Sequence, residues 1–214
     1  MTSILVMAFT VFAYLIGSIP FGYLLVKWSG KGDVRSIGSG GTGATNAMRA
    51  GGKWIALLTL FLDAGKGIVA AILSYLPFLT VDHIDDALNF CIAVAGALFI
   101  PLAALLGHMY PAWLGWRGGK GFASFIGLTI MYSYLYTGLP FILLGTWIII
   151  FLVTRISSLS ALTGILLANI ALWVEGNHLC YIYSALSLLV IFAHRGNIAR
   201  MLKGEEHRFS FSKK

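Results

Sequence analysis

Long apolar stretches, separated by short polar connections, occupy most of the 214-residue chain. They run approximately over 3–26, 54–77, 87–106, 121–138, 139–153, 160–174 and 179–194. About 20 apolar residues suffice for a helix that crosses a bilayer, where a helix satisfies its own backbone hydrogen bonds. With 58% of its residues apolar and 11% charged, the chain is expected to be an all-α integral membrane protein. We expect about seven transmembrane helices, several of them short, and one polytopic domain over residues 1–214.

The charged residues predict an orientation. Lysine and arginine gather in the connections 27–53, 107–121 and 155–160 and in the tail from 194 onward, whereas 78–86 carries three aspartates and no basic residue. Basic connections stay on the cytoplasmic side of a membrane. This pattern places the N-terminus outside and the C-terminus in the cytoplasm. It also explains the net charge of +7 without nucleic-acid binding. The first apolar stretch lacks a preceding basic region, so we expect it to be a permanent helix.

The first basic connection contains the sequence GSGGTGATNAMR. Its glycines permit sharp turns and expose N–H groups, while hydroxyl and amide side chains add donors. A helix beginning near Ala44 would add its N-terminal field, and Arg49 could close the site with a forked pair of hydrogen bonds. The expected phosphate-binding residues are Gly38, Gly40, Gly43, Thr45 and Asn46. The alternative is a re-entrant glycine hairpin with a surface arginine.

The second connection, GHMYPAWLGWRGGKG, combines a histidine with a glycine-flanked lysine. A nucleotide-binding loop requires Ser or Thr after its lysine, whereas Lys120 is followed by glycine, and the glycine spacing is one residue short. We therefore exclude an ATP site. Lys120 either acts as a point charge on a phosphate oxygen or simply anchors the loop at the cytoplasmic face. The candidate phosphate-binding residues here are His108, Gly118, Gly119, Lys120 and Gly121.

Three further groups of polar residues carry alternatives. Asp63 and Lys66 lie three residues apart within an apolar stretch, so Lys66 either contributes to an anion site or forms a self-neutralising structural pair. Ser158 lies in a short basic connection, where it either contacts substrate or caps the next helix. His194 and Asn197 share a stripe with Arg200, and a histidine near an acid is a candidate for proton transfer; the alternative is a polar helix cap. Histidines, acids and the two cysteines do not cluster, so we expect no metal and no cofactor.

Together these motifs closely resemble the bacterial membrane acyl-phosphate:glycerol-3-phosphate acyltransferase family. The resemblance rests on GSGGTGATNAMR, the Asp63-x-x-Lys66-Gly67 element, GHMYPAWLGWRGGKG and HRGNIAR followed by a glutamate, and it covers approximately 17–208. It implies seven helices and transfer of a fatty acyl group from acyl phosphate to the sn-1 hydroxyl of glycerol 3-phosphate. The products would be lysophosphatidic acid and phosphate, in the first step of phospholipid synthesis.

The resemblance also implies site residues and a location. Its functional residues fall here on Ser39, Arg49, His194, Asn197 and Glu206, which we take as catalytic, and on Ser158 and the Gly118–Gly121 loop. It implies a multi-pass protein of the bacterial cytoplasmic membrane, a cytoplasmic active site, and coupling to the enzyme that makes acyl phosphate from acyl carrier protein. The chain departs from the family in having Gly41 where asparagine is usual. The rival function is a small-anion or phosphate-ester transporter, which would need polar residues leading to both membrane faces.

Overall fold

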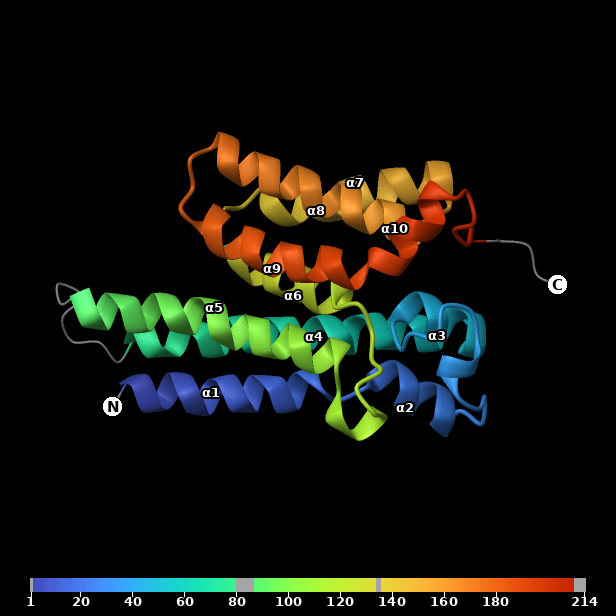
Figure 1. The fold of residues 1–214 in the computed structure, drawn as a ribbon, viewed down its shortest axis with the longest axis horizontal. Coiled ribbons are helices and arrows are strands. Elements are labelled where there is room, and N and C mark those ends of the chain that lie inside the picture. Colours follow the sequence, from blue (N-terminus) through green and yellow to red (C-terminus); the bar gives the residue numbers. More distant parts are fainter. Residues whose placement is uncertain (1, 80–86, 134–135, 210–214) are drawn as a thin grey trace. The chain divides into compact units, whose positions relative to one another are not determined.

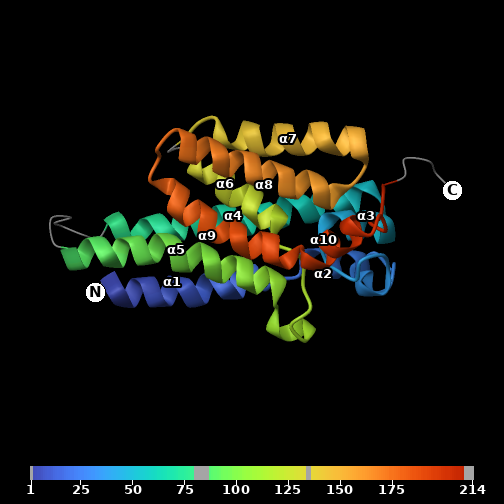
Figure 2. The ribbon, with the colours of Figure 1, turned by 45° about the horizontal axis from the view of Figure 1, so that its top comes forward.

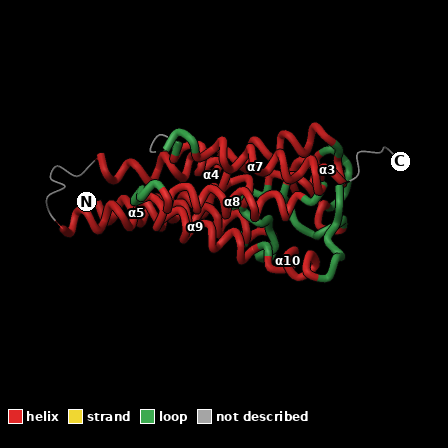
Figure 3. The backbone as a smooth tube through the Cα atoms, turned by 90° about the horizontal axis from the view of Figure 1, so that it is seen from above, coloured by secondary structure: helices red, strands yellow, loops and turns green. Residues whose placement is uncertain are grey.

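The computed structural model describes residues 2–79, 87–133 and 136–209. These residues form helices and the connections between them, with no strand in the described ranges (Figure 3). The prediction of an all-α protein is therefore confirmed. Most of the acidic connection expected at 78–86, including its three aspartates, lies outside the described residues.

The chain divides into two compact units, Met1–Met131 and Tyr132–Lys214. Each has its own packed helices and its own group of polar residues, and each is described by itself below. The expectation of a single domain stays a prediction.

The first unit is built around three long helices that lie side by side (Figure 1). They are α1 (Thr2–Gly17), α4 (Lys53–Leu79) and α5 (Ala87–Met109), and each contacts the other two. The shorter elements are α2 (Phe21–Trp28), the 3-10 turn η1 (Val34–Ser36), α3 (Ala44–Gly51), the 3-10 turn η2 (Ala112–Leu114) and α6 (Phe122–Tyr132), whose last residue falls in the second unit. Since α4 and α5 are antiparallel neighbours, the start of α4 and the end of α5 lie together, and both glycine-rich connections are found there.

Glycines allow the long helices of the first unit to approach at backbone distance. A side chain at Gly17 of α1 would overlap the carbonyl of Ala104 in α5, and one at Gly107 of α5 would overlap the carbonyl of Tyr14. The same relation joins α4 to α6, where Gly67 lies against the carbonyl of Ser124. Small residues at helix contacts are the usual means of close packing in membranes. Here they fix the helices that carry the loops.

The apolar stretch predicted at 3–26 contains a break. α1 ends at Gly17 and α2 begins at Phe21, with Pro20 at the N-cap of α2. Proline has no backbone N–H to donate. Breaking the helix at Pro20 therefore sacrifices one hydrogen bond fewer than breaking it at any other residue type would. The break leaves carbonyl groups available to side chains from elsewhere in the unit.

The second unit contains α7 (Leu139–Thr154), α8 (Ser157–Val174), α9 (Leu179–Ala193) and α10 (Arg195–Leu202). α8 packs against both α7 and α9 (Figure 2). Asn169 of α8 joins it to α9 by donating to the hydroxyl of Ser187 at 2.8 Å and accepting from that of Ser184 at 2.8 Å. α9 and α10 meet at His194 with a bend of 60°.

Four helical segments among the described residues are long and apolar enough to cross a membrane: Thr2–Trp28, Lys53–Pro77, Ala87–Leu114 and Ser157–Val174. The bent pair α9 and α10 makes a fifth if it is one span, and α6 and α7 are shorter apolar helices. An integral membrane protein is thus confirmed. Each predicted apolar stretch contains a helix, but α6 ends at Tyr132, well short of the expected 138.

Candidate functional site

The first glycine loop is held in shape by the buried side chain of Asn46. Its Nδ2 donates to the carbonyl of Val34 at 2.7 Å and to the carbonyl of Gly41 at 2.8 Å. Asn46 is 3% exposed and lies in α3, which begins at Ala44 where the sequence predicted a helix. Both protons of this amide group are therefore used inside the protein. Asn46 braces the loop, and the expectation that it donates to a substrate phosphate finds no support in its geometry.

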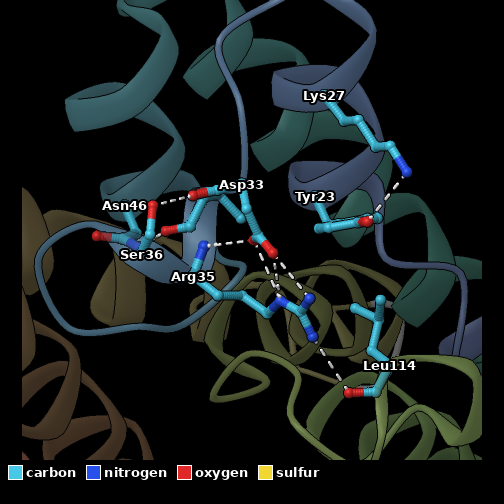
Figure 4. Close-up of polar contacts among 8 residues, drawn as sticks. Tyr23, Lys27, Asp33, Arg35, Ser36, Asn46 and Leu114 are labelled. Atoms are coloured by element: carbon cyan, nitrogen blue, oxygen red, sulfur yellow. Dashed lines mark hydrogen bonds and ion pairs between the residues drawn. The ribbon is translucent and has the colours of Figure 1, made fainter.

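A second brace joins this loop to the next one (Figure 4). The guanidinium of Arg35 binds Asp33 through Nη2 at 2.8 Å and Nε at 3.1 Å, and Nη1 donates to the carbonyl of Leu114 at 3.4 Å. The same guanidinium lies over the ring of Tyr23, 5.1 Å from its centroid. Hydrogen bonding from Arg35 lowers the pKa of the Asp33 carboxyl below its ordinary value of 3.8. The sequence analysis missed this pair, for which the spacing Asp-x-Arg was the available signal.

Gly38, Ser39 and Arg49 are the exposed residues of GSGGTGATNAMR. Gly38 and Gly40 both have a left-handed backbone, with φ of 56° and 71°. A side chain at Gly38 would reach within 2.9 Å of Nη1 of Arg49 and 2.6 Å of Oδ1 of Asn46. Glycine is therefore needed at position 38 for both its conformation and its lack of a side chain. The turn leaves the guanidinium of Arg49 beside the loop backbone.

Two other predicted residues belong to the start of α3. Gly43 is its N-cap, and the Gly43 carbonyl accepts the N–H groups of Asn46 and Ala47, both at 3.0 Å. Thr45 is half-buried in the first turn. A phosphate-binding role for Gly43 and Thr45 stays a prediction.

Position 41, where the family resemblance would predict asparagine, has room for a side chain. A Cβ there would lie 3.7 Å from Oγ of Ser39 and 3.8 Å from the carbonyl oxygen of Gly118, both ordinary contact distances. The bond from Asn46 to residue 41 uses only the main-chain carbonyl of that residue, which any amino acid provides. Glycine at this position therefore leaves the loop's hydrogen bonds intact.

The second glycine loop is folded back on the end of α5. The N–H of Gly118 donates to the carbonyl of Met109 and that of Gly119 to the carbonyl of His108, both at 3.0 Å. A side chain at Gly118 would overlap the His108 carbonyl. These two amides thus bond to helix carbonyls rather than facing a ligand, contrary to our expectation for a phosphate-binding turn. The half-buried Lys120 and the left-handed Gly121, with φ of 81°, follow directly.

The loop is also tied to α1. Nε1 of Trp113 donates to the carbonyl of Ser18, in the break after α1, at 2.5 Å. The hydroxyl of Tyr14 donates to the carbonyl of Tyr110 at 3.0 Å. Together with the Arg35 brace, these bonds hold the two glycine loops next to each other in the first unit.

Lys66 and His108, both predicted to bind phosphate, are buried. Nζ of Lys66 lies 2.7 Å from Oδ1 of Asp63, and both side chains are 2% exposed. Nδ1 of His108 lies 3.6 Å from the same oxygen. The pairing with Asp63 favours the structural interpretation of Lys66 that the sequence left open, and a direct contact of either residue with phosphate stays a prediction.

In the second unit, Glu206 gathers the predicted residues around its carboxylate. Oε1 accepts the hydroxyl of Ser158 at 2.7 Å and Nδ2 of Asn197 at 2.5 Å, while Oε2 accepts Nε of Arg200 at 2.7 Å. The Glu206 side chain is 6% exposed. The N–H of Phe209 donates to the carbonyl of Arg155 at 2.7 Å, which fastens the tail beyond Glu206. Glu206 therefore positions Ser158 and Asn197, which the sequence analysis placed in one site without knowing what joins them.

His194 occupies the bend between α9 and α10 and is 3% exposed. Its Nδ1 lies 2.8 Å from the carbonyl oxygen of Val190. A carbonyl only accepts hydrogen bonds, so Nδ1 carries a proton, and in the neutral ring Nε2 carries the lone pair. This tautomer suits a proton acceptor acting through Nε2. Within the described ranges, no three His, Cys, Asp or Glu side chains are grouped in a way that could hold a metal ion.

Stability should depend on pH through Glu206. Burial alone raises the pKa of this carboxyl, but the hydrogen bonds from Ser158, Asn197 and Arg200 outweigh burial and hold the pKa below its usual 4.5. A lowered folded-state pKa gives stability that is present above the unfolded pKa and lost as pH falls through the folded one. Thermal unfolding in detergent should show wild type more stable than Glu206→Gln at about pH 7, with the gap closing below about pH 4. A gap that persists in acid would contradict this assignment.

Comparison with known proteins identifies the family. A model of the family "Glycerol-3-phosphate acyltransferase" matches residues 7–204. A glycerol-3-phosphate acyltransferase of Maricaulis maris is 43% identical over 216 residues, covering all of this chain and 92% of that protein. One from Brucella ovis is 41% identical over 199 residues, covering 92% of this chain and 90% of that protein.

Two solved structures are also similar. Both are crystal structures of PlsY (YgiH), described as an integral membrane glycerol 3-phosphate acyltransferase. The glycerol 3-phosphate form matches with a TM-score of 0.80 and 36% identity over 96% of each chain. The lysophosphatidic acid form matches with a TM-score of 0.77 and 35% identity over 96% of this chain and 95% of that one. The helices and their glycine loops are thus those of a membrane-embedded acyltransferase. The chain belongs to the glycerol-3-phosphate acyltransferase family.

Proposed function

We propose that the protein transfers a fatty acyl group from acyl phosphate to the sn-1 hydroxyl of glycerol 3-phosphate, forming lysophosphatidic acid and inorganic phosphate. Family membership supports the acceptor, and the relatives crystallised with glycerol 3-phosphate and with lysophosphatidic acid support both acceptor and product. The observation that carries the proposal is the bracing of two cation-bearing glycine loops against each other in the first unit. A reaction between two phosphorylated substrates needs two such anion sites.

Arg49 and Lys120 are proposed to supply the charge for these sites. Arg49 and the first loop hold one substrate phosphate, with Ser39 and the backbone of Gly38 and Gly40 as further contacts. Lys120 holds the other phosphate as a point charge. Fixed positive charge at a water-poor surface stabilises the negative charge that builds on the departing phosphate.

An acyl phosphate is a mixed anhydride, so a covalent acyl-enzyme is not required. The hydroxyl oxygen of glycerol 3-phosphate attacks the acyl carbon, a C–O ester bond forms, and the bond from that carbon to the phosphate oxygen breaks. Holding both substrates together supplies much of the rate acceleration. The hydroxyl proton passes either to Nε2 of His194 or to the departing phosphate. Ser158 and Asn197, held by Glu206, are proposed to act in the same reaction.

The proposed setting is the bacterial cytoplasmic membrane, with about seven spans, the N-terminus outside and the active site facing the cytoplasm. The distribution of basic connections supports this orientation, and α6, α7 and the α9–α10 pair supply the spans beyond the four long ones. Acyl phosphate is a reactive lipid, so the enzyme that makes it from acyl carrier protein is the proposed functional partner.

The purified protein in detergent micelles should convert palmitoyl phosphate and glycerol 3-phosphate into equal amounts of lysophosphatidic acid and phosphate. Palmitoyl-CoA or palmitoyl-acyl carrier protein, offered as sole donor, should give no product. Lysophosphatidic acid formed equally well from a thioester would refute the donor assignment. Phosphate-ester flux across proteoliposomes without product would instead establish the transporter alternative.

A further inference from the structure

A buried polar cluster lies directly beneath the second glycine loop. It consists of Asp63 and Lys66 from α4, His108 from α5 and Ser124 from α6, with exposed fractions of 1%, 2%, 6% and 0%. The hydroxyl of Ser124 donates to the main-chain carbonyl of Asp63 at 2.9 Å and lies 3.4 Å from Nδ1 of His108. The cluster thus joins three helices within the first unit.

The bonds around Ser124 determine the tautomer of His108. A serine hydroxyl has one proton, and Ser124 gives that proton to the Asp63 carbonyl. It can therefore interact with Nδ1 of His108 only as an acceptor, so Nδ1 is the protonated nitrogen. Oδ1 of the Asp63 carboxylate lies 3.6 Å from the same nitrogen and attracts its N–H electrostatically. Asp63 and Ser124 together fix the orientation of the imidazole ring.

The ring in turn supports the glycine loop. Its other nitrogen, Nε2, faces Gly119 so closely that a side chain on Gly119 would overlap it. The backbone of His108 makes a second contact, because its carbonyl accepts the Gly119 N–H at 3.0 Å. Gly119 is thus held by both the side chain and the main chain of one residue, and Lys120 follows it directly.

A role in stability alone does not account well for this cluster. Burying an ion pair costs solvation energy that its mutual attraction barely recovers, and apolar residues of similar size often stabilise a protein equally well. A charged pair within a transmembrane segment is especially costly. Nζ of Lys66 also lies 5.0 Å from the ring centre of Phe21, so the ammonium is enclosed by Asp63 and an aromatic face. Lys66 therefore compensates the charge of Asp63 inside the protein.

We propose that Asp63, compensated by Lys66, orients His108 so that its ring sets the position of the Gly118–Gly121 turn and aims Lys120 at a substrate phosphate. Asp63, Lys66, His108 and Ser124 are positioning residues under this proposal, and their effect on the reaction passes through the loop. The proposal rests on the role given above to Lys120, and it replaces direct phosphate binding by Lys66 and His108.

The test separates substrate binding from folding. The double variant Asp63→Leu/Lys66→Met removes both buried charges together, so the fold should survive, with a melting temperature within about 5 °C of wild type. The KM for one of the two phosphate substrates should rise at least about tenfold, while the other KM and kcat change less than about threefold. Lys120→Ala should raise the KM of the same substrate. Wild-type KM values for both substrates in a folded double variant would overturn the proposal.

Further variants keep the test decisive if the double variant does not fold. His108→Leu, which keeps the volume but loses the Nδ1 donor, should raise the same KM, and His108→Asn, which restores a donor at the δ position, should recover part of the loss. A lowered melting temperature with both KM values unchanged would indicate a merely structural role. Ser74→Ala is the matched control, since Ser74 is a buried hydroxyl of α4 that donates within its own helix to the carbonyl of Ala71. It should leave both KM values unchanged.

The outcome for Lys120→Ala distinguishes this inference from the proposed function. If that variant alters neither KM, Lys120 is not a phosphate ligand and the positioning proposal is overturned with it. If Lys120→Ala raises a KM and the His108 variants do not, the function stands and only the positioning role fails.

Discussion

Arg49→Ala should lower the rate of lysophosphatidic acid formation by about two to three orders of magnitude while leaving the protein folded. The guanidinium lies beside the backbone of Gly38, at an exposed position on α3. Among the residues that the structure describes, it has no ion-pair partner. Removing it therefore leaves no buried carboxylate behind, and the loss should fall on substrate binding and charge stabilisation. Initial rates with palmitoyl phosphate, together with thermal melts in detergent, measure both quantities.

Two further variants define what Arg49 contributes. Arg49→Lys keeps the charge but loses the forked donor pair, so its rate should lie between wild type and alanine. Lys31→Ala removes an exposed cation from the same connection and should leave the rate unchanged. A near-normal rate for Arg49→Ala would end the assignment of Arg49 to a substrate phosphate.

Gly67→Ala should prevent the first unit from folding correctly. The added methyl group would overlap the main-chain carbonyl of Ser124, and that atom cannot rotate away as a side chain can. α4 and α6 would have to separate; overpacking that shifts backbone typically costs about 1–3 kcal/mol, and a direct overlap with a main-chain carbonyl belongs at or above the upper end of that range. We expect little monodisperse protein from detergent extracts and no acyl transfer, as measured by size-exclusion chromatography and the same assay.

Gly65→Ala provides a control in the same helix. Apart from the adjoining backbone of α4 itself, no atom of the described residues lies within 4 Å of a Cβ built at Gly65, so the methyl group enters open space. Alanine favours a helix over glycine by about 1 kcal/mol, and the variant should be as stable as wild type or slightly more so. Normal folding of Gly67→Ala, or failure of Gly65→Ala, would contradict the packing described for α4 and α6.

Hydropathy predicted where the helices lie, because burial in a membrane is a property of long segments. α4, α5, α8 and α9 begin and end within about three residues of the predicted stretches. The break at Pro20 and the early end of α6 were not predicted, since both depend on local backbone bonds and on packing against other helices. The basic loops were likewise visible in the sequence, but the bonds that hold two of them together within the first unit were not.

The individual roles of site residues were harder to predict than their identity. The sequence marked Asn46 as a hydrogen-bond donor. A donor can bond to a substrate or to the protein itself, and the sequence alone does not show which acceptor it has. The amides of Gly118 and Gly119 were expected to face phosphate, but they bond to α5. Glu206 was assigned to catalysis, which stays a prediction, and its three bonds in the second unit give it a positioning role that the sequence did not indicate. Contacts between residues distant in sequence decide each of these cases.

The reciprocal glycine contacts between α4 and α6 limit how this protein can evolve. Gly67 meets the main chain at Ser124, and Gly127 meets the main chain at Ala64. When a bulky side chain collides with another side chain, a second mutation can shrink the neighbour and restore fitness. Here the obstructing atoms are carbonyl groups that every amino acid possesses, so no compensating mutation at the contact exists. Both glycines should therefore be irreplaceable in any descendant that keeps these helices together, whatever happens to the residues around them.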